Sequence, residues 1–252
     1  MVYLVEHFYS IQGEGAYVGT PSLFFRFGGC NMKCEGFECT QRAKDGTVIK
    51  GCDTIYAVNK EHFSHNWAEI RSVDELINVF KLYDLPECVD VVITGGEPLL
   101  NTNEEVFTSF IKVLIENNYR VTFETNATIL PDFEKYSSFK ECTYALAVKL
   151  ENSGESYKKR VVPKVISTIT SSVKESFFKF SIDPDSIDAS LDNEIDEILS
   201  YAPKTKVYCM PVAYDKEELE KNTPTLIEYC KTKGYNFSDR LHMRVWDKER
   251  GV

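Results

Sequence analysis

Short apolar runs alternate with amphipathic segments along most of the chain. The runs are rich in aromatic and β-branched residues, as buried strands are, and lie at 22–27, 90–94, 120–125, 143–149, 176–182 and 206–210. Between them, helical patterns cover about 72–83, 104–117, 191–200 and 217–231. Ser72 and Glu75 form a capping-box pattern at the start of the first. Strands alternating with helices predict right-handed βαβ units and a mainly parallel sheet.

This pattern favours an open, curved α/β sheet. About six core strands are too few for a closed eight-stranded barrel. Residues 1–20 and 31–71 are expected to lie over the top of the sheet, and the polar segment 149–159 to form a surface loop. Neither a repeat nor a long low-complexity linker divides the sequence, so we expect one domain over 1–252.

Composition and charge narrow the classes of function. The chain has 252 residues, of which 43% are hydrophobic, and its 29 basic and 39 acidic residues give a net charge of −10. An acidic protein is poorly suited to a broad electrostatic grip on nucleic acid phosphates. No stretch approaches the roughly 18 apolar residues of a membrane helix, and the first ten residues lack a signal-peptide pattern. We therefore expect a cytoplasmic protein without membrane or nucleic acid partners.

Half of the eight cysteines lie within residues 30–52. Cys30 and Cys34 directly follow a predicted strand, which is a suitable place for metal ligands. The third ligand is either Cys39 or Cys52. Asp45-Gly46 is a hairpin signal between them, and a hairpin would bring Cys52 back towards Cys34.

The spacing of these cysteines permits two kinds of metal site. Three thiolates can hold three irons of a [4Fe–4S] cube and leave the fourth iron open. Four thiolates could instead form a closed zinc site, and a role in packing alone is a third reading. The scattered cysteines are assigned to packing: Cys88, Cys142, Cys209 and Cys230.

A glycine-rich turn follows the apolar strand at 90–94. Adjacent glycines, Gly95 and Gly96, let the backbone approach a ligand closely, and Glu97 and Pro98 follow them. Exposed amides and carbonyls of this turn, together with Glu97, could hold the ammonium and carboxylate of an amino acid. The alternative is a tight strand-to-helix turn that Pro98 stops.

Together, the cysteine loop after the first core strand and the Gly-Gly-Glu-Pro turn resemble the radical S-adenosylmethionine (SAM) superfamily. The resemblance implies a partial, open β/α barrel. It also implies that three cysteines bind a [4Fe–4S] cluster whose open iron is chelated by SAM, with the methionine amino group at the glycine turn. The cluster then reduces SAM to a 5′-deoxyadenosyl radical, so the cofactor performs the difficult step.

From about Val5 to Asn126 the chain resembles one family more closely, the 7-carboxy-7-deazaguanine synthases of queuosine and deazapurine biosynthesis, and the resemblance thins towards the C-terminus. The motifs that carry this resemblance are residues 8–15 (FYSIQGEG), 19–21 (GTP), 25–31 (FRFGGCN) and 52–57 (CDTIYA). Since Cys52 and not Cys39 precedes Asp-Thr, the resemblance assigns the cluster to Cys30, Cys34 and Cys52. Here 17 residues, 35–51, separate the last two, whereas most of the family has two; Cys39 then belongs to an insertion.

The resemblance implies a lyase that contracts the ring of 6-carboxy-5,6,7,8-tetrahydropterin to 7-carboxy-7-deazaguanine with loss of ammonia. SAM acts catalytically and Mg²⁺ is required; no side chain is assigned a catalytic role. The implied substrate residues are Ile11, Gln12, Gly13, Glu14, Arg26 and Thr94. The implied cofactor residues are Gly51, Cys52, Asp53, Gly96, Ala147, Val148 and Lys149, of which 147–149 match the family's Ser-Pro-Lys at one position.

The chemistry of these residues suits such a substrate. Arg26 offers a planar charged fork for a carboxylate. Gln12, the Gly13 backbone and Glu14 could read the donors and acceptors of a pterin edge. Thr54 supplies the hard oxygen that Mg²⁺ prefers. Residues 124–126 are placed either to line the cofactor pocket or to cap a turn.

The resemblance also implies a homodimer, a C-terminus near the substrate, and a flavodoxin- or ferredoxin-like electron donor. Two other functions stay open. A glycyl-radical activating enzyme shares the cysteines and the glycine turn but needs no pterin pocket. A zinc-stabilised binding module would use the four clustered cysteines, Cys30, Cys34, Cys39 and Cys52.

Overall fold

The computed structural model describes residues 1–86 and 89–252. Its main sheet has the strand order β11-β10-β9-β8-β7-β6-β2-β1-β5 and is open, because β11 and β5 are its two edges. Six neighbouring strands run parallel, which confirms the predicted number: β2 (Pro21–Phe27), β6 (Asp90–Gly95), β7 (Arg120–Thr125), β8 (Thr143–Leu146), β9 (Glu175–Ile182) and β10 (Lys206–Pro211). The short β11 (Asn236–Phe237) continues the parallel set.

The N-terminal segment differs from expectation. Residues 2–11 do not lie over the sheet; they form β1 (Val2–Ile11), which pairs antiparallel with β2. Val2 and Leu4 are buried in the core, whereas most of the strand is only half-buried. The strand is only partly covered because it lies next to the edge of the sheet. A further short strand, β5 (Ala68–Ile70), pairs with β1 at that edge.

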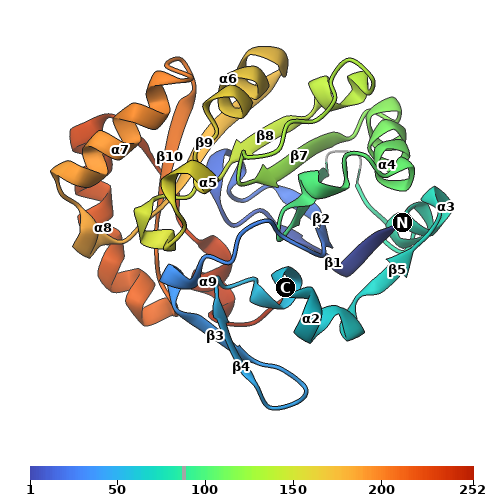
Figure 1. Ribbon diagram of the computed structural model, residues 1–252, viewed down its shortest axis with the longest axis horizontal. Helices are drawn as coiled ribbons and strands as arrows, with labels where there is room; N and C mark the ends of the chain where they lie inside the picture. The colour runs from blue at the N-terminus through green and yellow to red at the C-terminus, as the bar shows by residue number, and fades with distance from the viewer. Residues whose placement is uncertain (87–88) are drawn as a thin grey trace.

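Helices cover the outer face of the curved sheet (Figure 1). The predicted ones are α3 (Val73–Phe80), α4 (Glu105–Glu116), α7 (Ala189–Ser200) and α8 (Lys216–Lys233). The sequence patterns did not predict α6 (Pro163–Ser172) or α9 (Leu241–Trp246). Ser72 accepts a hydrogen bond from the Glu75 amide, so the capping box at α3 is confirmed. The core between sheet and helices is rich in phenylalanine; for example, Phe27 and Phe123 both contact Phe107.

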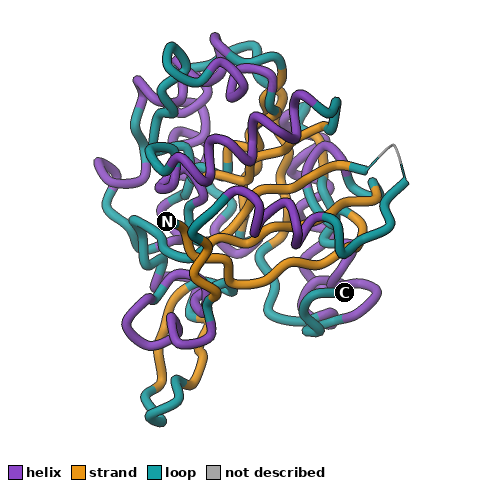
Figure 2. Tube along the Cα trace, turned by 90° about the vertical axis from the view of Figure 1, so that its right-hand side faces the viewer, coloured by secondary structure: helices purple, strands orange, loops and turns teal. Residues whose placement is uncertain are grey.

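The predicted hairpin is present. Strands β3 (Cys39–Arg42) and β4 (Val48–Gly51) pair antiparallel, with Gly46 at a φ of +90° in the connecting turn. The hairpin projects from the body of the protein in both views (Figures 1 and 2). Its register places Cys39 opposite Gly51. The chain therefore returns to the cysteine loop just before Cys52, and two short helices, α1 (Ile55–Val58) and α2 (Lys60–Phe63), follow.

The polar segment 149–159 is more ordered than a surface loop. It contains the 3-10 turn Glu151–Ser153 and the start of α5 (Tyr157–Arg160), whose Arg160 is buried and paired with Glu194. Cys142, Cys209 and Cys230 are buried, as the packing prediction requires, and Cys88 lies outside the described residues. Within the described ranges, no helix combines the length and apolar character needed to cross a membrane.

Candidate active site

A cavity of about 960 Å³ lies at the carboxyl ends of the parallel strands. This is where α/β proteins of this class hold their ligands. The predicted site residues that line it are Ile11, Gln12, Gly13, Glu14, Arg26, Cys30, Cys34, Cys52, Asp53, Thr54, Thr94, Gly96, Ala147 and Lys149. Residues 124–126 line it too.

Two predicted cofactor residues do not line the cavity. The Val148 side chain is buried in the main hydrophobic core, because successive residues after β8 point to opposite sides. Gly51 packs under the cysteine loop, where a Cβ would lie 3.0 Å from the Lys33 carbonyl oxygen and closer still to Ile55. Both positions therefore shape the fold behind the site.

The cysteine loop is fixed by contacts at both of its sides. On one side Asn31 accepts from the Asn126 side-chain amide at 2.8 Å and donates to the Thr128 hydroxyl at 2.8 Å. On the other side the backbone amides of Lys33 and Cys34 donate to the Glu155 carboxylate at 2.5 and 3.1 Å. Glu155 belongs to the segment predicted to be a plain surface loop, so that segment supports the site.

The three predicted cluster ligands share one wall of the cavity. Burial raises the pKa of the Cys30 thiol to about 12 and that of Cys34 to about 11, and it also raises the pKa of Cys52. Over residues 1–86 and 89–252, no three Cys, His, Asp or Glu side chains converge to hold a single metal ion. In a [4Fe–4S] cube each thiolate binds a different iron, so three cysteines on one wall are a donor set that fits such a cluster.

The glycine turn packs directly against the cysteine loop. A Cβ at Gly96 would lie 2.3 Å from the Gly29 carbonyl oxygen and 2.8 Å from Cys30 Cβ, so only glycine fits there. The Gly96 amide donates to the Phe27 carbonyl at 3.2 Å, and the Glu97 amide to the Gly29 carbonyl at 2.8 Å. These two amides are used within the protein, which corrects the expectation that they are exposed for a ligand.

Glu97 corrects the same expectation, since its side chain is fully buried and does not line the cavity. It accepts from the Leu99 amide at 3.0 Å, the Thr125 hydroxyl at 2.8 Å and the Asn126 amide at 2.7 Å. Burial raises the pKa of Glu97 to about 7, although the three hydrogen bonds act in the opposite direction and lower it. Glu97 thus joins the end of β6 to the end of β7 and fixes both cavity walls.

Replacing Glu97 with glutamine should destabilise the protein. One acceptor oxygen becomes an amide donor facing another donor, which costs about 1–3 kcal/mol for a buried group. Urea unfolding at neutral pH measures this loss of unfolding free energy. The matched control is Glu116→Gln at an exposed position of α4, which should change the unfolding free energy by no more than about 0.5 kcal/mol. Equal stability of the two variants would contradict the role assigned to Glu97.

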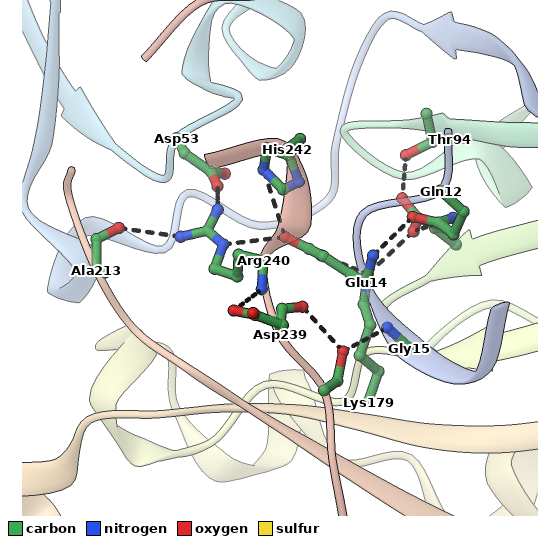
Figure 3. Close-up of polar contacts among 12 residues, drawn as sticks. Gln12, Glu14, Gly15, Asp53, Thr94, Lys179, Ala213, Asp239, Arg240 and His242 are labelled. Carbon is green, nitrogen blue, oxygen red and sulfur yellow. Dashed lines mark hydrogen bonds and ion pairs between the residues drawn. The ribbon is translucent and has the colours of Figure 1, made fainter. Parts of the chain in front are cut away.

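A buried charge network surrounds Glu14 (Figure 3). Lys179 Nζ lies 3.0 Å from Glu14 Oε2, Arg240 Nε lies 3.0 Å from Glu14 Oε1, and His242 Nε2 lies 3.8 Å from the same oxygen. Burial opposes the charge on Glu14, but these neighbours outweigh it and hold its pKa well below the usual range. Burial also lowers the pKa of His242, which favours the neutral ring.

Glu124 and its neighbours extend this network along the cavity wall. Glu124 Oε1 lies 3.0 Å from Lys179 Nζ and accepts from Gln12 Nε2 at 3.4 Å, while Oε2 accepts from the Thr94 hydroxyl at 3.0 Å. Gln12 in turn accepts from the Glu14 amide at 3.0 Å. The predicted substrate residues Gln12, Glu14 and Thr94 therefore form one connected set of polar groups.

Arg26 presents part of its guanidinium to the cavity. Its Nε donates to Glu6 Oε1 at 2.7 Å, and Tyr56 donates to the same oxygen at 2.9 Å. Among the described residues the two terminal nitrogens of Arg26 make neither a hydrogen bond nor an ion pair. The side chain is thus anchored at one edge and open at the other, which suits capture of an anion.

The C-terminal segment contributes groups that the sequence patterns did not identify. Arg240 bridges Glu14 and Asp53, lying 3.0 Å from each, and donates to the Ala213 carbonyl at 2.9 Å (Figure 3). It gave no motif signal. Lys179 could have been noticed, since it is the one charged residue inside the apolar run 176–182. Arg240, His242, Met243 and residues 247–252 line the cavity, as expected for a C-terminus near the site.

Comparisons with known proteins agree with this geometry. Residues 25–172 match the radical SAM superfamily. A 7-carboxy-7-deazaguanine synthase of Rhodopirellula baltica is 27% identical over 98% of this chain and 87% of its own, and one of Hyperthermus butylicus is 29% identical over 96% and 92%.

Solved structures show the same fold. The crystal structure of QueE from Escherichia coli has a TM-score of 0.63 at 19% identity, covering 96% of this chain and 94% of that one. Streptococcus suis SuiB bound to S-adenosylmethionine has a TM-score of 0.51 at 15% identity, covering 84% of this chain and 48% of that one. The open, mainly parallel sheet is thus the partial barrel of such proteins. The chain belongs to the radical SAM superfamily and is an enzyme related to the 7-carboxy-7-deazaguanine synthases.

Proposed function

We propose that this enzyme converts 6-carboxy-5,6,7,8-tetrahydropterin to 7-carboxy-7-deazaguanine with loss of ammonia. The observation that carries the proposal is the composition of one cavity. The open fork of Arg26 and the connected polar groups of Gln12, Glu14 and Thr94 line it together with three cysteines. The curated relatives that match nearly the whole chain are named for the same product.

The polar groups suit the two ends of this substrate. The free edge of Arg26 can pair with the substrate carboxylate through two parallel hydrogen bonds. The carboxylate oxygens of Glu14 and Glu124 are acceptors, as the amino and ring N–H groups of a pterin require. Local charge therefore permits binding of an anionic substrate although the protein as a whole is acidic.

The superfamily implies a [4Fe–4S] cluster and SAM, and the residues present fit both. Cys30, Cys34 and Cys52 would hold the cluster, and Gly96, Asp53, Ala147 and Lys149 would surround SAM. When bound, this pair supplies one-electron chemistry that amino-acid side chains cannot. In this proposal Thr54, whose hydroxyl lies 3.3 Å from Cys52 Sγ, offers its oxygen to Mg²⁺.

In this proposal the chain's own residues bind the substrate, orient it and enclose it. The cavity lining includes the C-terminal residues, so the tail excludes water from the reacting groups. The proposal includes a flavodoxin- or ferredoxin-like donor for the cluster and a homodimer, with a single domain in which residues 35–51 are the insertion.

Anaerobic turnover tests this proposal. Protein with a reconstituted cluster, a chemical reductant, SAM and Mg²⁺ should consume the carboxytetrahydropterin and form 7-carboxy-7-deazaguanine. Liquid chromatography with mass spectrometry measures both compounds. SAM should be recovered intact. Protein that reductively cleaves SAM but leaves the pterin untouched would contradict the proposal and favour another radical enzyme, such as one that activates a glycyl-radical protein.

A further inference from the structure

Lys179 is the one charged side chain in an otherwise apolar stretch of β9. Its neighbours Phe178 and Phe180 are fully buried in the core on one side of the strand, while Lys179 points to the other side, into the cavity. Only 5% of Lys179 is exposed. A buried ammonium is costly unless it is paired, so Lys179 needs partners of opposite charge.

The partners of Lys179 are two carboxylates. Lys179 Nζ lies 3.0 Å from one oxygen of Glu14 and 3.0 Å from one oxygen of Glu124. Glu14 follows β1, and Glu124 lies in β7. One ammonium on β9 therefore holds together two carboxylates from distant parts of the sequence.

Two half-buried carboxylates that meet at one ammonium repel each other, and without the Lys179 charge between them one of the two would take a proton more readily. A protonated carboxyl group presents a donor where the site needs an acceptor. Arg240 cannot replace Lys179, because it reaches Glu14 and Asp53, whereas Lys179 alone spans Glu14 and Glu124 among the ion pairs of the described residues.

We propose that Lys179 is a positioning residue that holds Glu14 and Glu124 side by side as a double acceptor for adjacent N–H donors of the substrate's heterocycle. The inference rests on the proposed function, because it takes the pterin as the ligand. Lys179 itself acts through the two carboxylates and not on the reacting atoms.

Binding at two pH values tests the inference. The probe is carboxytetrahydropterin, titrated calorimetrically into anaerobic protein that carries its cluster and SAM, at about pH 6 and about pH 8. At each pH, the dissociation constant of the variant is divided by that of the wild type. The ligand's own protonation affects both constants equally, so it does not affect this ratio. Lys179→Met should weaken binding about 10- to 100-fold at the lower pH, as lost charge-assisted hydrogen bonds do, and less at the higher pH, where both carboxylates ionise.

The pH dependence of binding that Lys179 causes has to be distinguished from the pH dependence that other charged groups at the site cause. Arg240 and His242 face Glu14 from the C-terminal segment, Asp53 reaches Arg240 from the cysteine side, and Arg26 acts on Glu124 from β2. The double variant Glu14→Gln/Lys179→Met isolates the Lys179 effect. In the Glu14→Gln background, the added loss from Lys179→Met should shrink to about threefold or less, because the two changes act on one interaction.

Two controls keep the test decisive if Lys179→Met folds poorly. Lys179→Arg retains the cation and should bind within about fivefold of wild type at both pH values. The double variant removes one negative charge with the positive one, so it avoids an unpaired buried charge. A Lys179→Met effect that is equal at both pH values and unchanged in the Glu14→Gln background would overturn the inference. Wild-type protein that neither binds nor converts the pterin would overturn the proposed function itself.

Discussion

Replacing Cys52 with serine is expected to abolish the iron–sulfur cluster, whereas Cys39→Ser should leave it in place. Cys52 shares the cavity wall with Cys30 and Cys34, and its Sγ lies beside Thr54 at the end of the returning hairpin. Loss of one of three thiolates removes an iron ligand directly. Because changes outside the ligand shell already cost about 10–100-fold in metal affinity or activity, Cys52→Ser should lower turnover by more than about 100-fold.

Iron and sulfide content, together with the visible absorbance of anaerobically purified protein, measure this difference. Cys39→Ser is the matched control, since Cys39 lines the same cavity but lies in β3 opposite Gly51. Burial raises the pKa of the Cys39 thiol to about 11, the same value as for Cys34, so metal content and not thiol pKa distinguishes the two roles. Equal loss of metal in both variants, with zinc and no sulfide in the wild type, would support the zinc module instead.

Replacing Arg26 with methionine is expected to raise KM for the carboxytetrahydropterin strongly. The guanidinium is anchored to Glu6 through Nε, and no described residue pairs with its terminal nitrogens, which can therefore bind the substrate carboxylate. Hydrogen bonds to a charged group contribute about 1.5–3 kcal/mol, which corresponds to about 10- to 150-fold in kcat/KM. Steady-state kinetics with SAM saturating should show this as a change in KM more than in kcat.

The loss can be assigned to the carboxylate by changing the ligand. Arg26→Lys keeps the charge but loses the fork, so its kcat/KM should fall between those of wild type and Arg26→Met. A pterin analogue without the carboxylate should bind wild type and Arg26→Met with similar affinity. If the analogue discriminates between them as strongly as the substrate does, Arg26 acts through Glu6 and Tyr56 on the fold of the site and not on the carboxylate.

The elements that the sequence predicted correctly have strong local signals. The run behind β6, 91–94, is wholly apolar or β-branched, as expected of a parallel strand that is buried on both faces. The hairpin around Gly46 and the cap at Ser72 depend on a few adjacent residues. The cysteine loop and glycine turn were likewise readable, since each is a contiguous segment whose chemistry limits the residues that can occupy it.

The elements that were missed depend on distant partners. Strand β1 carries mixed polar and apolar residues and is stabilised by pairing with β2 and β5. Gly96, Glu97 and Val148 each lie in a recognisable segment, yet only packing decides which atoms face the cavity and which are used inside the protein. Sequence alone could therefore place these segments near the site but not orient their groups.

The sequence by itself determined the alternation of strands and helices, the segments that carry the cysteines and glycines, and the resemblance to the radical SAM enzymes. Those properties reside in neighbouring residues and their spacing. The tertiary structure alone decided that Lys179 joins Glu14 to Glu124, and that Arg240 joins Glu14 to Asp53. Charges separated by more than fifty residues interact only when folding brings them together, and the burial of Lys179 and Arg240 strengthens their attraction to these carboxylates.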